Sequence, residues 1–230
     1  MNPQNLPAVL HEVRERIAQA AVAAGRNAQS VTLLAVGKAQ PLELLTAAAD
    51  CGVSDFGESY LQEALAKIAA LRARALTWHF IGRIQANKTR PIAEVFSWVH
   101  ALDRLRVAER LAAQRPPAAP PLNVCLEVNI AAEPSKGGVT PAELPALAAA
   151  VARLPRIALR GLMCIPPEET EPARQRAWFT RLRGLRDDLN AAGYSLDTLS
   201  MGMSADFEAA IEEGATIVRL GTVLFGARPR

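Results

Sequence analysis

Eight short apolar segments of β-type composition, separated by helical patterns, constrain the fold of this 230-residue chain more than any other feature. These segments are residues 31–36, 53–56, 77–81, 97–101, 123–129, 158–165, 196–200 and 216–220. Runs such as VTLLAV and NVCLEVNI are almost continuously apolar, as parallel strands covered on both faces require. Strands and helices that alternate eight times over about 200 residues predict an α/β protein, a single (β/α)8 barrel of TIM type.

The helical segments fit between these strands. Residues 42–50 end just before Gly52, and residues 171–192 end just before Gly193, where glycine favours the end of a helix. Leu10, Val13 and Ile17 recur at three- and four-residue spacing, which predicts an extra N-terminal helix. A doubly wound open sheet is the alternative fold, but the glycine-rich turn expected after its first strand is absent.

Composition limits the partners of the chain. The formal net charge is +3, from 26 basic and 23 acidic residues, and this balance does not predict binding to nucleic acid or to a membrane surface. No apolar run reaches the ~18 residues of a membrane span, and the charged N-terminus lacks the pattern of a signal peptide. Three dispersed cysteines show no spacing typical of a metal site. We therefore expect a cytoplasmic protein with reduced, structural cysteines and no metal.

The proline-rich stretch 115–121 is only seven residues long and joins a helix to a strand. Its length predicts a rigid loop rather than a linker between domains. Residues 1–230 are accordingly expected to form one domain.

In a barrel of this type the functional residues lie at the carboxyl ends of the strands, and these positions are polar here. Lys38 follows the first strand, where partial burial would favour its neutral, nucleophilic amine. Such an amine can form a Schiff base with an aldehyde. Lys38 could instead extend to the rim of the barrel and pair with Glu58 or another carboxylate.

The segments after the seventh and eighth strands are the usual phosphate site of this fold. Gly202, Met203 and Ser204 follow the seventh strand, and Gly221 and Thr222 follow the eighth. The glycines allow close approach of the backbone, and Ser204 could present its hydroxyl at the start of a helix. An ordinary helix cap is the alternative role for Ser204.

Arg219 alternates with apolar neighbours in the eighth strand, so it could point into the mouth of the barrel or form a structural ion pair. A lysine that traps aldehydes, a phosphate site and a fixed cation together fit pyridoxal 5'-phosphate.

The chain also resembles the YggS/PROSC family of pyridoxal phosphate homeostasis proteins over nearly its whole length. The segments that carry this resemblance are LLAVGK, DFGESYLQE, WHFIGRIQANKTR, EVNI…SKGG, RGLMCIPP and MGMSADFEAAIEEGATIVRLGTVLFGAR. The family fold is similar to the N-terminal barrel of alanine racemases.

This resemblance implies a role for each site residue. Lys38 would carry the cofactor as a Schiff base, and Arg219 would face the pyridine nitrogen. Ser204, Gly221 and Thr222 would bind the phosphate. Met163 would lie near the ring, although the sequence fits an ordinary core methionine at least as well.

One position departs from the family pattern. Ser59 stands where the family usually has asparagine, and serine reaches less far toward a cofactor. This difference puts any role of residue 59 in doubt.

Two classes of function remain open, a carrier of pyridoxal phosphate and a racemase or decarboxylase of amino acids. Related racemases add a C-terminal β domain with a catalytic tyrosine, and the sequence ends after the eighth strand. His79 could serve as a second acid or base, but a histidine within a strand is more often structural. We therefore expect a non-catalytic, monomeric carrier that binds pyridoxal phosphate and other B6 vitamers and supplies enzymes that depend on this cofactor.

Overall fold

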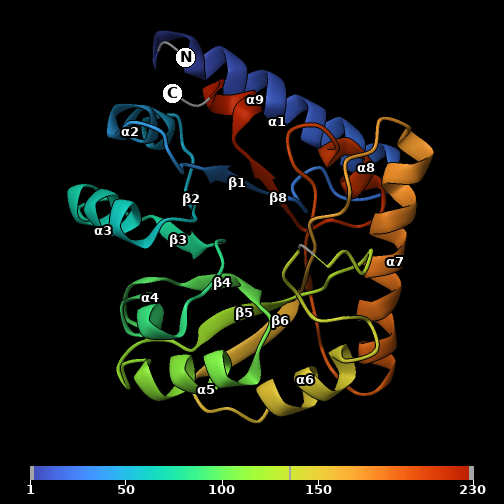
Figure 1. The fold of residues 1–230 in the computed structure, drawn as a ribbon. Coiled ribbons are helices and arrows are strands. Elements are labelled where there is room, and N and C mark those ends of the chain that lie inside the picture. Colours follow the sequence, from blue (N-terminus) through green and yellow to red (C-terminus); the bar gives the residue numbers. More distant parts are fainter. Residues whose placement is uncertain (1–2, 135, 228–230) are drawn as a thin grey trace.

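A computed structural model describes residues 3–134 and 136–227, which form a closed parallel barrel surrounded by helices (Figure 1). Its strands follow one another around the barrel in sequence order, and β8 closes on β1. The strands are β1 (Thr32–Val36), β2 (Asp55–Glu58), β3 (Thr77–Phe80), β4 (Trp98–Leu102), β5 (Leu122–Glu127), β6 (Ile157–Met163), β7 (Thr198–Ser200) and β8 (Ile217–Leu220). The predicted (β/α)8 barrel is confirmed. Ser135 and Arg228, which belong to two of the sequence motifs, lie outside the described residues.

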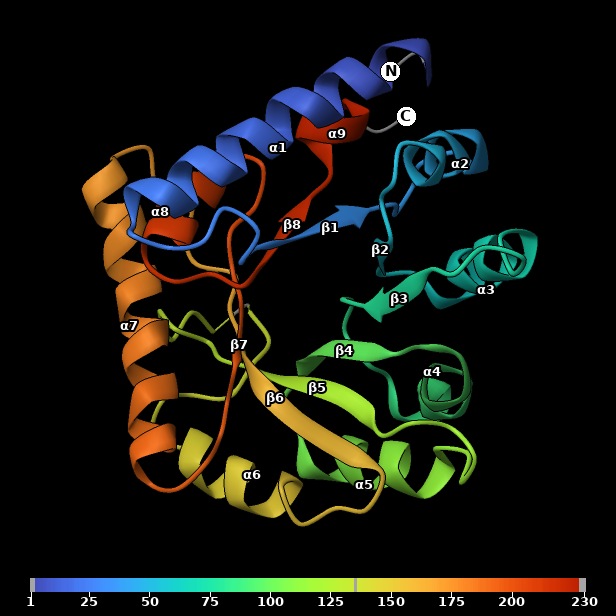
Figure 2. The same ribbon diagram turned by 180° about the vertical axis from the view of Figure 1, so that it is seen from behind.

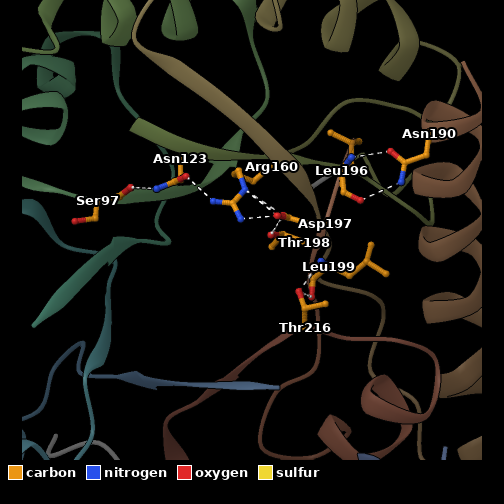
Figure 3. Close-up of polar contacts among 9 residues, drawn as sticks. All are labelled: Ser97, Asn123, Arg160, Asn190, Leu196, Asp197, Thr198, Leu199 and Thr216. Carbon is orange, nitrogen blue, oxygen red and sulfur yellow. Dashed lines mark hydrogen bonds and ion pairs between the residues drawn. The ribbon is translucent and has the colours of Figure 1, made fainter. Parts of the chain in front are cut away.

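Two predicted strands begin two residues too early, and hydrogen bonds to the preceding helices explain both differences. The Val53 amide donates to the Ala48 carbonyl, so Val53 belongs to the end of the preceding helix. Leu196 exchanges two hydrogen bonds with the Asn190 side chain, which hold it away from the sheet (Figure 3). An apolar residue can therefore be buried against a helix end without joining the strand that follows.

The helices cover the outside of the barrel, and an additional N-terminal helix packs across two short C-terminal ones (Figure 2). The helical elements are η1 (Pro3–Asn5), α1 (Leu6–Ala23), α2 (Leu42–Asp50), α3 (Leu61–Ala70), η2 (Ala86–Lys88), α4 (Thr89–Val95), α5 (Leu105–Gln114), α6 (Leu144–Val151), α7 (Pro172–Ala191), α8 (Phe207–Glu212) and α9 (Thr222–Phe225). Helix α1 buries Leu10, Val13 and Ile17, each worth roughly 1.5–3 kcal/mol. Among the described helices, none is both long and apolar enough to cross a membrane.

Polar contacts hold the amino ends of neighbouring strands together (Figure 3). Arg160 of β6 binds Asp197 and donates to the Asn123 side chain at 2.9 Å, and Asn123 donates to the Ser97 carbonyl. The Arg160 guanidinium also lies 5.1 Å from the centre of the Trp98 ring. The amino end of a barrel serves stability, so the carboxyl end remains for ligands.

Candidate functional site

A cavity of about 340 Å³ lies at the carboxyl ends of the strands. Seven of the ten predicted site residues line it: Lys38, Met163, Met203, Ser204, Arg219, Gly221 and Thr222. The cavity brings together residues that the sequence separates by up to 184 positions, because the first and last strands are neighbours in the barrel. Its volume falls within the range of ~300–1,000 Å³ that is typical of small-ligand sites.

The other three predicted residues are not part of the described cavity lining. Gly202 has a φ of 93°, which glycine adopts without strain, and a side chain there would collide with Ala210. Glycine at this position therefore allows both the turn after β7 and the close packing of α8. The Ser59 main chain packs closely against Gly82 beside the mouth. His79 is buried inside the barrel, below the cavity, where it contacts other polar side chains.

Seven described lining residues are not among the predicted site residues: Val36, Gln40, Ile81, Ile165, Glu168, Ala205 and Gly226. Gln40 and Ile81 follow β1 and β3, and Ile165 and Glu168 lie in the long connection after β6. Strand-end position would have indicated Ile81, but the sequence gives no sign of how the connection after β6 folds over the mouth.

Lys38 lies in a tight turn directly after β1. The next residue, Ala39, has a φ of 56°, which is unusual for a residue with a side chain. The Ala39 amide donates to Glu63 Oε1 at 2.8 Å, and the Gly37 carbonyl accepts from Lys67 Nζ at 2.7 Å. Contacts on both sides therefore fix the backbone that presents Lys38 to the cavity.

Glu58 stands at the end of β2 and is completely buried. One carboxylate oxygen accepts from Lys67 Nζ at 3.0 Å, and the other has no hydrogen-bond partner among the described residues. Burial raises the pKa of Glu58 to about 7, although the positive charges of Lys67 and Lys38 lower it. Lys67 is thus a direct ion-pair partner of Glu58, a role that the sequence suggested for Lys38.

The loops after β7 and β8 are joined through Ser204. Its hydroxyl oxygen accepts from the Val223 amide at 3.2 Å. The expectation that Ser204 begins or caps a helix is wrong, because α8 starts at Phe207 and Asp206 precedes it. The Asp206 carboxylate instead accepts from the Met203 amide at 2.6 Å and fixes that turn. Ser204 therefore ties the two loops together at the edge of the cavity.

Arg219 is almost fully buried in β8 and reaches the cavity from below. It donates to the Ser200 carbonyl at 2.6 Å, the Ser200 hydroxyl at 2.9 Å and the Cys164 carbonyl at 2.9 Å. No ion pair of Arg219 occurs within residues 3–134 and 136–227, so these contacts do not support the alternative of a structural ion pair. Burial lowers the pKa of Arg219, but an arginine remains charged.

A larger hollow of about 560 Å³ lies at the amino ends of β1 and β2. Arg14 lines it and donates to the carbonyls of Cys51 and Gly52, which fastens α1 to the barrel. This end of a barrel usually contributes stability, so we assign the ligand site to the smaller cavity. The described part of the chain holds no cluster of three His, Cys, Asp or Glu side chains suited to a metal.

The cysteines lie within the structure without disulfides. Cys125 and Cys164 are buried, and burial raises the pKa of each thiol to about 12. Thiols in such surroundings are unreactive and act as small apolar residues.

The fold and the cavity together define a class of protein, a barrel in which a lysine after the first strand faces two small-residue loops. Comparison with known proteins agrees with this class, because the model of the alanine racemase N-terminal domain family matches residues 10–229. Proteins named pyridoxal phosphate homeostasis protein are close in sequence. The one from Pseudomonas aeruginosa is 59% identical over 94% of this chain and 93% of its own, and the one from Escherichia coli K12 is 49% identical over 95% of each. The chain belongs to the family of pyridoxal phosphate homeostasis proteins.

Solved structures support the same grouping. PipY of Synechococcus elongatus PCC7942, solved with PLP bound, is 34% identical, with a TM-score of 0.84 over 96% of this chain and all of its own. Alanine racemase from Corynebacterium glutamicum is 19% identical, with a TM-score of 0.73, and the match covers 96% of this chain but 62% of the racemase. The racemase likeness shows the fold alone.

Proposed function

We propose that the cavity binds pyridoxal 5'-phosphate, held as a Schiff base on Lys38, and that the protein carries and buffers this cofactor. Through this role it would maintain vitamin B6 and amino-acid homeostasis. The observation that carries the proposal is the meeting of Lys38, Arg219 and the loops after β7 and β8 in one cavity. The bound cofactor in PipY and the names of the relatives support the choice of ligand.

The lining suits the phosphate and the pyridine ring of this cofactor. Ser204 and Thr222 offer hydroxyl groups for the phosphate, and Gly221 lets the ligand approach the backbone. Among residues 3–134 and 136–227, the atom nearest to a Cβ at Gly221 would be one of Val36 at 3.5 Å, which is an ordinary contact. Arg219 supplies a fixed cation for the ring nitrogen, and Met163 an apolar surface for the ring. Met203 completes the wall on the side of the phosphate.

The residues favour a carrier over a catalyst. When bound, the cofactor supplies an aldehyde and an electron-withdrawing ring. A guanidinium beside the ring nitrogen disfavours its protonation and so weakens that withdrawal. Neither tyrosine of the chain is among the described residues of the cavity wall, since Tyr60 is exposed and Tyr194 packs on the core. We therefore infer a non-enzymatic role.

One observation favours the alternative of a racemase or decarboxylase. Glu168 lines the cavity together with Lys38 and is a carboxyl group able to exchange protons. Assays of amino-acid racemisation and decarboxylation with Glu168→Gln as the control decide between the two classes. The carrier proposal predicts no steady turnover in the wild-type protein. Turnover that both Lys38→Ala and Glu168→Gln abolish would establish an enzyme instead.

The proposal extends to partners and location. A cofactor held by one reversible covalent bond and surface loops can pass to enzymes that depend on pyridoxal phosphate, and the same cavity would admit other B6 vitamers. We expect the carrier to act as a cytoplasmic monomer. Neither nucleic acid nor a membrane is expected as a partner, given the balanced charge of the chain.

A matched pair of lysine variants tests the ligand and its attachment. Lys38→Ala and Lys38→Arg both lack an amine that can form a Schiff base, but arginine keeps the positive charge. Both should lack the Schiff-base absorbance band and the covalent attachment that borohydride makes permanent by reducing the imine, and both should retain weaker, reversible binding through the phosphate loops. A variant that still shows the Schiff-base band and keeps the cofactor covalently after borohydride reduction would refute attachment at Lys38.

A further inference from the structure

A buried chain of hydrogen bonds crosses the interior of the barrel from β2 to β8. Asp55 Oδ1 lies 3.1 Å from His79 Nε2, and His79 Nδ1 lies 2.9 Å from His100 Nε2. His100 Nδ1 lies 2.7 Å from Ser200 Oγ, which also accepts from Arg219 at 2.9 Å. The five side chains connect a carboxylate at the amino end of the barrel with the guanidinium that lines the cavity.

The two ends of this chain determine the direction of every hydrogen bond within it. A guanidinium only donates, so Ser200 Oγ accepts from Arg219, and His100 Nδ1 is the acceptor that the described contacts of this buried hydroxyl offer to its hydrogen. His100 must then carry its hydrogen on Nε2 and donate to His79 Nδ1. His79 likewise carries its hydrogen on Nε2 and donates to Asp55, which as a carboxylate only accepts. Both histidines are thereby fixed as neutral rings with the hydrogen on Nε2.

The surroundings of the two rings agree with this assignment. Burial lowers the pKa of both His79 and His100, and the nearby charge of Arg219 lowers that of His100 further. Burial alone would raise the pKa of Asp55, but hydrogen bonds from His79 and Ser54 bring it below its ordinary value. In this arrangement a second hydrogen on His79 would meet the hydrogen on His100 Nε2, and a second hydrogen on His100 would turn the buried Ser200 hydroxyl away from its described acceptor.

Side chains from the other strands leave the rings little freedom. The Trp98 ring of β4 stacks on His79 with a centroid distance of 5.6 Å and an interplanar angle of 7°. The ionisable groups whose charge would act on Arg219 are the thiols of Cys125 and Cys164 and the carboxylates of Glu127 and Asp206. Both thiols are uncharged near neutral pH, because burial raises each pKa to about 12.

We propose that Asp55, His79, His100 and Ser200 are positioning residues that hold the Arg219 guanidinium in the orientation required by the ligand ring. The identity of that ring as pyridoxal phosphate rests on the function proposed above. Ser200 is the link, because it accepts from Arg219 while its own hydrogen is directed to His100 Nδ1, which fixes the rotation of the hydroxyl group. The Asp55 side chain is 22% exposed and lines the amino-end hollow, whereas Ser200, next to Arg219, is completely buried.

Nitrogen-15 NMR of the histidine-labelled wild-type protein without cofactor tests the assignment directly. The chain has three histidines, and the exposed His11 provides the reference for a ring in water. His79 and His100 should both show the neutral form with hydrogen on Nε2 from about pH 5.5 to about pH 8. A ring with hydrogen on Nδ1, or a charged ring, in this range would overturn the proposal, whether or not the protein binds pyridoxal phosphate.

A matched pair of variants at His79 tests the effect on the ligand. Asparagine places an oxygen near the position of Nδ1 and can still accept from His100, whereas leucine cannot. His79→Leu should weaken pyridoxal phosphate affinity about tenfold and change the His100 nitrogen signals, and His79→Asn should stay within about twofold of wild type. Equal losses in the two variants, with the His100 signals unchanged, would assign His79 a purely structural role and overturn the proposal. Failure of the wild-type protein to bind would refute the proposed function but leave the NMR result standing.

Discussion

Replacing Glu58 with glutamine should change how the stability of the protein depends on pH. Glu58 has an ordinary pKa of 4.5 and a pKa of about 7 in the fold, because burial disfavours its charged form. At about 1.4 kcal/mol for each pH unit, this difference corresponds to about 3 kcal/mol. The glutamine side chain has the same shape and does not ionise in this range.

The direction of the effect follows from proton binding. Between pH 4.5 and about 7 the folded protein keeps a proton on Glu58 that the unfolded chain has released. The contribution of Glu58 to stability is therefore full below pH 4.5 and is lost as pH rises through about 7. Glu58→Gln lacks this loss. As pH rises from 4.5 to about 7, the free energy of unfolding of the variant should therefore decrease by up to about 3 kcal/mol less than that of the wild-type protein.

Urea unfolding of both proteins at a series of pH values from about 4.5 to about 8 measures this difference. Glu58→Gln contains every other ionisable group, including Glu127 and Asp206, whose pKa values burial also raises. Subtracting one pH profile from the other therefore isolates Glu58. Parallel profiles would refute the inference that the carboxyl group buried beside Lys67 keeps its proton near neutral pH.

Two further substitutions test the loops of the cavity. Ser204→Ala removes the acceptor of the Val223 amide and should weaken pyridoxal phosphate binding by about 1–2 kcal/mol. Ser30→Ala, at an exposed turn, is the control and should bind as the wild-type protein does. A Ser204→Ala protein with the wild-type dissociation constant would refute a role for Ser204. Gly221→Ala should barely change the melting temperature without ligand, because its φ is −120° and the nearest atom to a Cβ lies at 3.5 Å. The same variant should bind about tenfold more weakly or worse, because the methyl group enters the cavity. Gly184→Ala on α7 is the control. Wild-type affinity of the Gly221→Ala protein would show that the phosphate does not bind beside Gly221.

The architecture was accessible from the sequence because some strands, such as β1 and β5, are almost continuously apolar and recur between helical patterns. Segment 97–101 is less apolar, since it contains Ser97 and His100, yet it corresponds to β4 with a shift of one residue. The errors lie at strand ends. Val53 and Leu196 are as apolar as strand residues, but bonds to the preceding helices bury them, and a local pattern does not distinguish the two environments.

The cavity was predictable where residues lie next to strand ends and unpredictable where they depend on loops. Lys38 and Arg219 are fixed by β1 and β8, and the structure brings both to the mouth. Glu168 reaches the same cavity from a long connection whose path no periodic pattern indicates. The link between His79 and His100 depends on the register of β3 and β4, in which His79 is opposite Trp98. Alternation within β4 then puts His100 on the same inner face, so strand alternation was the available signal.

Attachment of the cofactor to Lys38 is best tested by mass spectrometry of the borohydride-reduced complex after proteolysis. The chain has four lysines, and the other three are Lys67, Lys88 and Lys136. Lys67 is held by Glu58 and the Gly37 carbonyl, while Lys136 donates to the Pro166 carbonyl beside the mouth. The proposed function predicts the pyridoxyl group on the peptide that contains Lys38. Its presence on Lys67, Lys88 or Lys136 instead would contradict it.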